Sequence, residues 1–210
     1  MDNKIIYLDN NATTKVDEKV LEKMLPYFSE RYGNPSSMYD FGGMVSKDIK
    51  IAREQVADFL GAQYPYEITF TGCGTESANI AIKGALEINK SMKHIITTKV
   101  EHPCVMNTYK WLEKRGYKVS YLSVNSEGEL MLDELKELVN QDTALVSIMW
   151  ANNETGVIFD VKKAGEIIKS IQPQDRRHDP ARRHDHDAGL RPGCRRCLCD
   201  RQEAQRVITL

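Results

Sequence analysis

Apolar residues in the first 171 positions follow two different spacings, which predict strands and helices in alternation. Short runs rich in β-branched residues predict four strands, at 68–71, 94–100, 118–124 and 144–151. Apolar residues at helical spacing predict helices at 75–90, 103–115, 132–140 and 161–171. Such alternation is typical of an α/β fold in which helices cover both faces of a mostly parallel sheet.

The segment before the first predicted strand has a helical pattern. Two amphipathic helices are predicted there, at 17–31 and 42–60. Between them, the sequence Gly-Asn-Pro-Ser-Ser at 33–37 has the composition of a loop. Further along, Pro103 suits the first turn of a helix and Gly116 suits a helix end.

The use of basic residues changes abruptly near position 171. All 17 lysines lie in residues 4–169, whereas 9 of the 12 arginines lie in residues 172–210. The last 39 residues contain only five Val, Ile, Leu, Met or Phe, a fraction too low for a stable core. The chain therefore divides into a body, residues 1–171, and an arginine-rich tail, residues 172–210, which we expect to be disordered or weakly structured.

Charge and composition argue against several classes of protein. The body carries 20 basic and 24 acidic residues, mixed along the chain, which does not indicate nucleic-acid binding. No apolar run approaches the roughly 18 residues that a membrane span needs. The N-terminus lacks a signal-peptide pattern and the five cysteines suggest no disulfide framework, so we expect a reduced, cytoplasmic protein.

Residues 68–79, Ile-Thr-Phe-Thr-Gly-Cys-Gly-Thr-Glu-Ser-Ala-Asn, form the strongest candidate for ligand binding. They predict a strand, a glycine-containing turn, and a helix that begins at Thr75. Gly72 and Gly74 allow the backbone to approach a ligand closely, and the first N–H groups of the helix together with the Thr75 hydroxyl can hold a phosphate. The alternative is an ordinary strand-to-helix turn in which Thr75 is the N-cap.

Two further polar segments follow predicted strands. Glu101 and His102 come directly after the strand at 94–100, at the end where open α/β sheets bind ligands. His102 could stack on a planar cofactor or transfer a proton there, or it could be an ordinary surface histidine. The segment Trp-Ala-Asn-Asn-Glu-Thr-Gly at 150–156 could contact a ligand or only cap a turn. His94, at the opposite end of its strand, is expected to be structural.

Five motifs taken together resemble a known family. They are Tyr-Leu-Asp-Asn-Asn-Ala-Thr-Thr at 7–14, Tyr-Gly-Asn-Pro-Ser-Ser at 32–37, Thr-Gly-Cys-Gly-Thr-Glu-Ser at 71–77, Glu-His-Pro-Cys-Val at 101–105, and the segment at 150–156. Over residues 4–171, their order and spacing resemble those of the NifS/IscS-type cysteine desulfurases. These are class-V aminotransferases that depend on pyridoxal phosphate. The resemblance implies the large domain of a fold-type I transferase, incomplete in this chain.

The resemblance also implies a cofactor, a reaction and partners. The cofactor is pyridoxal 5'-phosphate, with its phosphate at Gly74 and Thr75, its ring under His102 and its phenolic oxygen hydrogen-bonded to Asn153. His102 takes part in proton transfer, and no metal is implied. The reaction converts L-cysteine to L-alanine and leaves an enzyme persulfide, which supplies a sulfur-acceptor or iron–sulfur scaffold protein. Members of the family are homodimers.

Several features of the family are not recognisable in this chain. They are an aspartate and a glutamine near the cofactor, the lysine that binds it covalently, and the sulfur-accepting cysteine. Cys73 and Cys104 are interpreted as small packing residues. We therefore expect the 210-residue chain to have little or no activity. The alternatives are a non-catalytic fragment and a selenocysteine lyase-like member of the same family.

Three interpretations of the tail stay open. It could be a metal site, with the candidate ligands His184, His186, Cys194, Cys197 and Cys199. It could be a natural basic extension. We favour an out-of-frame translation, because arginine replaces lysine abruptly. In addition, Arg-Pro-Gly-Cys-Arg at 191–195 is one shifted reading of a Val-Gln-Ala-Val-Gly stretch that is common in the family.

Overall fold

A computed structural model describes residues 5–172 and 207–208 of the chain. The chain divides into two compact units, Met1–Phe70 (unit 1) and Thr71–Leu210 (unit 2). The predictions made for the tail lie outside the described residues, apart from Gln172 and the pair 207–208. None of the described helices is both long and apolar enough to cross a membrane.

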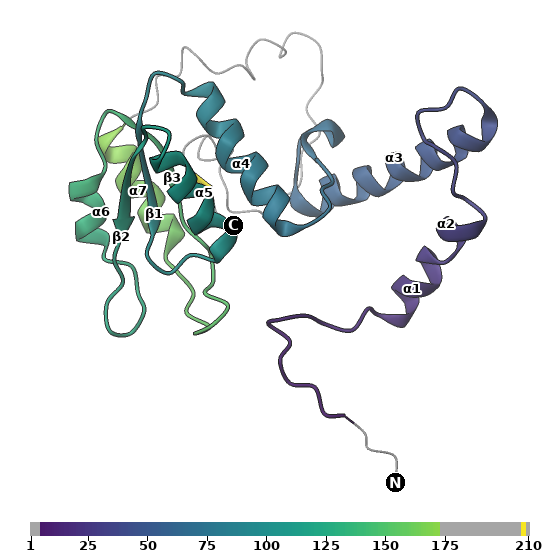
Figure 1. The fold of residues 1–210 in the computed structure, drawn as a ribbon, viewed down its shortest axis with the longest axis horizontal. Coiled ribbons are helices and arrows are strands. Elements are labelled where there is room, and N and C mark those ends of the chain that lie inside the picture. The colour runs from purple at the N-terminus through teal and green to yellow at the C-terminus, as the bar shows by residue number, and fades with distance from the viewer. Residues whose placement is uncertain (1–4, 173–206, 209–210) are drawn as a thin grey trace. The chain divides into compact units, whose positions relative to one another are not determined.

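Unit 2 is built on a parallel sheet, as the alternating pattern predicts. Its strands are β1 (His94–Thr98), β2 (Lys118–Leu122), β3 (Thr143–Ser147) and β4 (Val207–Ile208), in the order β2-β1-β3-β4. All pairings are parallel, so the carboxyl ends of the strands meet at one edge (Figure 1). The α/β fold with a mostly parallel sheet is confirmed.

Helices cover both faces of this sheet, because alternate strand residues point to opposite sides. Ile95 and Leu145 pack in one apolar cluster with α4 (Gly74–Ile88) and α5 (Pro103–Glu113). Ile96 and Val146 pack in the other, with α6 (Leu132–Leu138) and α7 (Val161–Ile171). The four helices predicted at 75–90, 103–115, 132–140 and 161–171 are therefore confirmed, with ends that differ by at most two residues.

His94 is a structural residue, as expected from its place at the start of β1. Its side chain is buried, and both ring nitrogens have partners. Nδ1 lies 2.8 Å from the Thr143 hydroxyl and accepts from the Asn140 amide at 3.1 Å, while Nε2 lies 2.9 Å from the Ser120 hydroxyl. Burial, together with the nearby Lys118 charge, lowers the pKa of His94.

Unit 1 is helical but is interrupted where the pattern predicts one helix at 17–31. The structure has α1 (Glu18–Met24), α2 (Pro26–Ser29), α3 (Asp40–Leu60) and a short 3-10 helix, η1 (Pro65–Glu67). The single-helix prediction is wrong because Pro26 has no backbone N–H to continue the first helix, and it suits the first turn of a new one.

The loop at 33–37 is confirmed, and it packs closely against the start of α3. A Cβ added at Gly42 would lie 2.4 Å from the carbonyl oxygen of Asn34. Beside it, the rings of Tyr32 and Phe41 meet edge to face with centroids 5.1 Å apart. Gly42 is therefore required by the close approach of two backbones.

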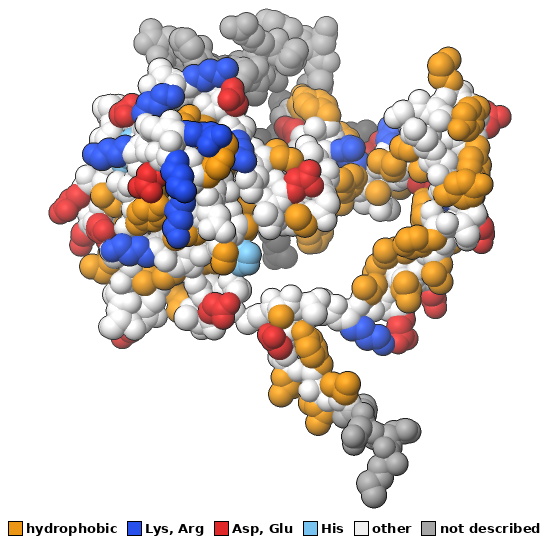
Figure 2. Space-filling model, in the orientation of Figure 1, with side chains coloured by type: hydrophobic (Ala, Val, Ile, Leu, Met, Phe, Trp, Pro, Cys, Tyr) orange, Lys and Arg blue, Asp and Glu red, His pale blue; other side chains and the backbone are white. Residues whose placement is uncertain are grey.

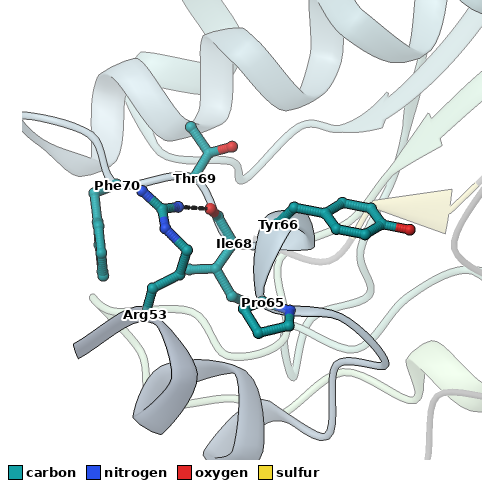
Figure 3. A pocket seen from close by; sticks show the side chains of 6 residues that line it. All are labelled: Arg53, Pro65, Tyr66, Ile68, Thr69 and Phe70. Carbon is teal, nitrogen blue, oxygen red and sulfur yellow. Dashed lines mark hydrogen bonds between the residues drawn. The ribbon is translucent and has the colours of Figure 1, made fainter. Parts of the chain in front are cut away.

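The strand predicted at 68–71 is absent, and this prediction is wrong. Ile68 is extended, but no described strand pairs with it. Its carbonyl accepts a hydrogen bond from the Arg53 guanidinium, which also lies 4.9 Å from the centroid of the Phe70 ring (Figure 3). An extended segment without a partner strand has no ladder of backbone hydrogen bonds to join.

The same residues surround an open depression of about 610 Å³ within unit 1. Its lining comes from α3, η1 and the segment that follows: Arg53, Pro65, Tyr66, Ile68, Thr69 and Phe70 (Figure 3). The guanidinium is the one charged group of this lining and is already bound to a carbonyl. The depression therefore offers little chemistry, and the candidate site lies elsewhere.

Unit 1 also leaves much apolar surface uncovered (Figure 2). No residue of α1 or α2 is buried, and Phe28 and Phe59 are 73% and 84% exposed. The apolar positions of α1 and α2 are therefore not covered within the described part of the chain, whereas α3 buries Val45 and Ala57.

Candidate functional site

The polar segments singled out in the sequence meet at one edge of the unit 2 sheet. His102 follows β1, and the segment at 150–156 follows β3, which is hydrogen-bonded to β1. α4 directly precedes β1 and runs in the opposite direction. The first turn of α4 therefore lies at the edge of the sheet where β1 ends (Figure 1). Gly74, Thr75, His102 and Asn153 thus share this edge, and all four are exposed.

The N-terminus of α4 has no side-chain cap. Its N-cap is Cys73, which makes no capping hydrogen bond, and Thr75 lies inside the first turn. The alternative in which Thr75 is the N-cap is therefore wrong. Cys73 is exposed, so its interpretation as a packing residue is also wrong.

The start of α4 has donors available for an anion. Glu76 Oε2 accepts from the backbone N–H of Gly72 at 2.6 Å, which fixes the turn before the helix. A Cβ placed at Gly74 would meet no atom within 4 Å, so the space beside this residue is open. Unpaired N–H groups at the positive end of a 15-residue helix favour a bound anion.

His102 is the N-cap of α5, and this contact determines the tautomer of its neutral ring. Its Nδ1 accepts from the backbone N–H of Cys104 at 3.2 Å and lies 3.0 Å from the Cys104 sulfur. Because Nδ1 uses its lone pair as acceptor, the neutral ring carries its proton on Nε2. The exposed ring therefore presents a donor. Cys104 is half-buried against the α4–α5 cluster, as its interpretation as a packing residue requires.

The two adjacent asparagines after β3 have different environments. Asn152 is buried, and its Oδ1 accepts from the backbone N–H groups of Glu154 and Thr155 at 3.0 and 2.9 Å. Asn153 is exposed, and its amide donates to the Glu154 carboxylate at 3.0 Å. Asn152 therefore orders the turn, whereas Asn153 is the one that can contact a ligand.

Glu101 lies beneath this edge and is only 8% exposed. Its Oε1 accepts from the backbone N–H of Met149 at 2.7 Å and from the Thr98 hydroxyl at 3.4 Å. Burial raises the pKa of Glu101 to about 7, although these two hydrogen bonds act in the opposite direction. The sequence motif identifies a role for His102 but none for Glu101, because the backbone N–H that binds the Glu101 carboxylate belongs to Met149, 48 residues further along the chain.

Within residues 5–172, no group of three or more His, Cys, Asp and Glu side chains is placed to hold a metal ion. The histidines and cysteines of the tail, on which the metal interpretation depends, lie outside the described residues. The chemistry of the described edge is therefore that of backbone N–H groups, an imidazole and a carboxamide.

Comparisons with known proteins agree with the resemblance in the motifs. Residues 6–173 match the family model Aminotransferase class-V. A cysteine desulfurase from Nostoc sp. is 56% identical over 165 residues, which are 79% of this chain and 41% of that protein.

Solved structures give the same result. A NifS-like protein superposes with a TM-score of 0.76 at 46% identity, over 80% of this chain and 46% of the other. A structure of SspA in complex with cysteine superposes with a TM-score of 0.71 at 35% identity, over 78% of this chain and 47% of the other. The chain spans less than half the length of these proteins.

Proposed function

Because the chain belongs to the class-V aminotransferase family, we propose that it supplies the cofactor-binding half of a cysteine desulfurase. The substrate is L-cysteine, and its sulfur passes to an acceptor or iron–sulfur scaffold protein as the product L-alanine forms. One observation carries the proposal: the uncapped start of α4, His102 and the Asn153 loop lie on one sheet edge in a chain of this family. The homodimeric state and the cytoplasmic location are parts of the same proposal.

Pyridoxal 5'-phosphate fits the residues of this edge. Its phosphate needs hydrogen-bond donors, and Gly74 and Thr75 supply backbone N–H groups at a helix N-terminus that no side chain caps. The Thr75 hydroxyl adds a further donor, and the open space beside Gly74 leaves room for the ligand. When bound, the cofactor withdraws electrons from the amino-acid carbon that reacts.

The other two residues of the edge would orient the cofactor, and His102 would also take part in proton transfer. His102 would stack on the ring and present the proton of Nε2, because Nδ1 accepts from the Cys104 N–H. Asn153 would donate from its amide to the phenolic oxygen in place of its present acceptor, Glu154. Each residue uses a group that is exposed at the edge.

The 210-residue chain should bind this cofactor without a covalent bond and release little sulfide. It has no lysine beyond Lys169, and the family segment that carries the cofactor-binding lysine is not recognisable in it. Without covalent attachment, the cofactor depends on the contacts of Gly74, Thr75, His102 and Asn153.

The test compares two ligands that differ only in the phosphate. Pyridoxal phosphate and pyridoxal are titrated into the chain, and binding is followed by absorbance and by tryptophan fluorescence. Thr75→Ala should weaken pyridoxal phosphate about tenfold, or ~1.4 kcal/mol, and leave pyridoxal unchanged. Ser91→Ala, beyond the opposite end of α4, is the control.

Equal affinities for the two ligands, or no effect of Thr75→Ala, contradict the proposed phosphate site. Sulfide release from L-cysteine is measured in the same samples. Release at a rate expected of a complete desulfurase contradicts the statement that this chain lacks its covalent anchor.

A further inference from the structure

We propose that Glu101 is a positioning residue of this site, which fixes the loop that carries Asn153 relative to His102. The inference rests on the proposed function, since it concerns the same sheet edge. The Glu101 carboxylate is buried and does not itself reach a ligand, so it acts through the backbone of the loop.

The first link joins the ends of β1 and β3 through the Glu101 side chain. Its Oε1 accepts from the backbone N–H of Met149 at 2.7 Å, and Met149 lies between β3 and the segment at 150–156. The Thr98 hydroxyl also donates to this oxygen, at 3.4 Å, which holds the carboxylate against β1. The Glu101 backbone directly precedes His102.

A second link runs in the opposite direction between the same two segments. The buried amide of Asn152 donates to the carbonyl oxygen of Val100 at 3.1 Å. Consecutive Cα atoms are about 3.8 Å apart, so fixing residues 101 and 152 confines the backbones of residues 102 and 153. The two links therefore set the separation of the imidazole and the carboxamide that we assign to the cofactor.

A purely stabilising role explains the carboxylate less well. Its second oxygen, Oε2, is buried without a hydrogen-bond partner among the described residues, which is costly for an ionised group. The link to Met149 needs only one acceptor oxygen. A neutral amide at this position preserves that acceptor, so Glu101→Gln should keep the geometry, whereas Glu101→Ala should lose it.

Glu134 provides a matched control. Its carboxylate makes the same kind of link after β2, where Oε2 accepts from the backbone N–H of Ser123 at 2.9 Å and Oε1 from its hydroxyl at 3.1 Å. This link holds none of the candidate site residues. Glu134→Ala therefore removes a carboxylate-to-backbone link without touching the site.

The experiment measures the affinity for pyridoxal phosphate and the NMR signals of the Asn153 amides. Glu101→Ala should weaken binding at least about tenfold and shift the Asn153 signals, while Glu101→Gln stays within about threefold of the unmodified chain. Glu134→Ala should leave both readouts unchanged. Unchanged affinity and unshifted Asn153 signals in Glu101→Ala overturn the proposal.

Two further outcomes are also decisive. If the unmodified chain does not bind pyridoxal phosphate, the proposed function fails, and the Asn153 signals alone decide the role of Glu101. If Glu101→Ala does not fold, Glu101→Asp replaces it, because a side chain one methylene shorter keeps the charge but withdraws the acceptor from Met149. Unshifted Asn153 signals in Glu101→Asp overturn the proposal.

Discussion

The N-cap of α5 permits a separation of structural and chemical roles at His102. Its Nδ1 accepts from the Cys104 N–H, one of the four N–H groups that a helix start leaves without an intrahelical partner. His102→Ala removes both this acceptor and the imidazole. His102→Asn removes the imidazole but supplies a side-chain oxygen, and asparagine is among the preferred N-cap residues.

The expected loss of stability in His102→Ala comes from the lost cap alone, because the ring is exposed and buries little apolar area. Loss of an N-cap acceptor costs about 1 kcal/mol of unfolding free energy, within a range of roughly 0.5–2 kcal/mol. His102→Ala should lower the stability of unit 2 by this amount, and His102→Asn by only a few tenths of it. Both substitutions should weaken cofactor binding by similar factors, since both remove the ring.

Urea unfolding followed by tryptophan fluorescence measures this stability. The chain has two tryptophans, Trp111 and Trp150, and both belong to unit 2. With a urea slope of roughly 1 kcal/mol per M, His102→Ala should lower the midpoint by about 1 M. If alanine and asparagine give the same midpoint as histidine, the cap does not stabilise the helix and the assignment of the Nε2 proton fails with it.

Three other predictions follow from single contacts. Burial raises the pKa of Glu101 above its unfolded value, so the folded state binds a proton more tightly than the unfolded state. The free energy of unfolding should therefore fall by roughly 3 kcal/mol as pH rises from about 4.5 to about 7. Glu101→Gln should lack this pH dependence, and an equal dependence in both proteins contradicts the burial argument. The pKa of His94 is lowered, so its ring should titrate below pH 6.5 when followed by NMR, and the free energy of unfolding should fall as the pH drops below that value. A titration midpoint at or above 6.5 contradicts this prediction. Gly42→Ala should lower the helical circular dichroism of unit 1, because its Cβ would lie 2.4 Å from the Asn34 carbonyl; an unchanged spectrum and melting temperature show that the loop yields.

Local patterns predict the elements of unit 2 well because strand alternation and helical spacing are short-range signals. The predicted strand at 68–71 fails for a different reason. A strand needs a neighbour, and its β-branched residues carry no information about whether one is available. The break at Pro26 is encoded locally, since proline removes a backbone donor, although the helical spacing at 17–31 continues across it.

The candidate site shows the same division between local and distant information. Gly74, Thr75 and His102 are placed by motifs of a few residues, and the structure puts them at helix starts. The helix predicted to begin at Thr75 begins at Gly74, one residue earlier, which is within the usual uncertainty of helix ends. Glu101 and Asn152 depend on contacts across about 50 residues, which no local pattern records.

The order of strands in the sheet determines when the site can exist during synthesis. β1 is flanked by β2 and β3, and the first residue of β3 lies 49 positions beyond that of β1. β2 leaves the ribosome before β3, and its pairing with β1 closes the shorter loop at the smaller entropic cost. β1 and β2 can therefore pair while residues 143–152 are still in the ribosome. During that interval His102 has no partner loop, so the pair of side chains that we propose for the cofactor is still incomplete.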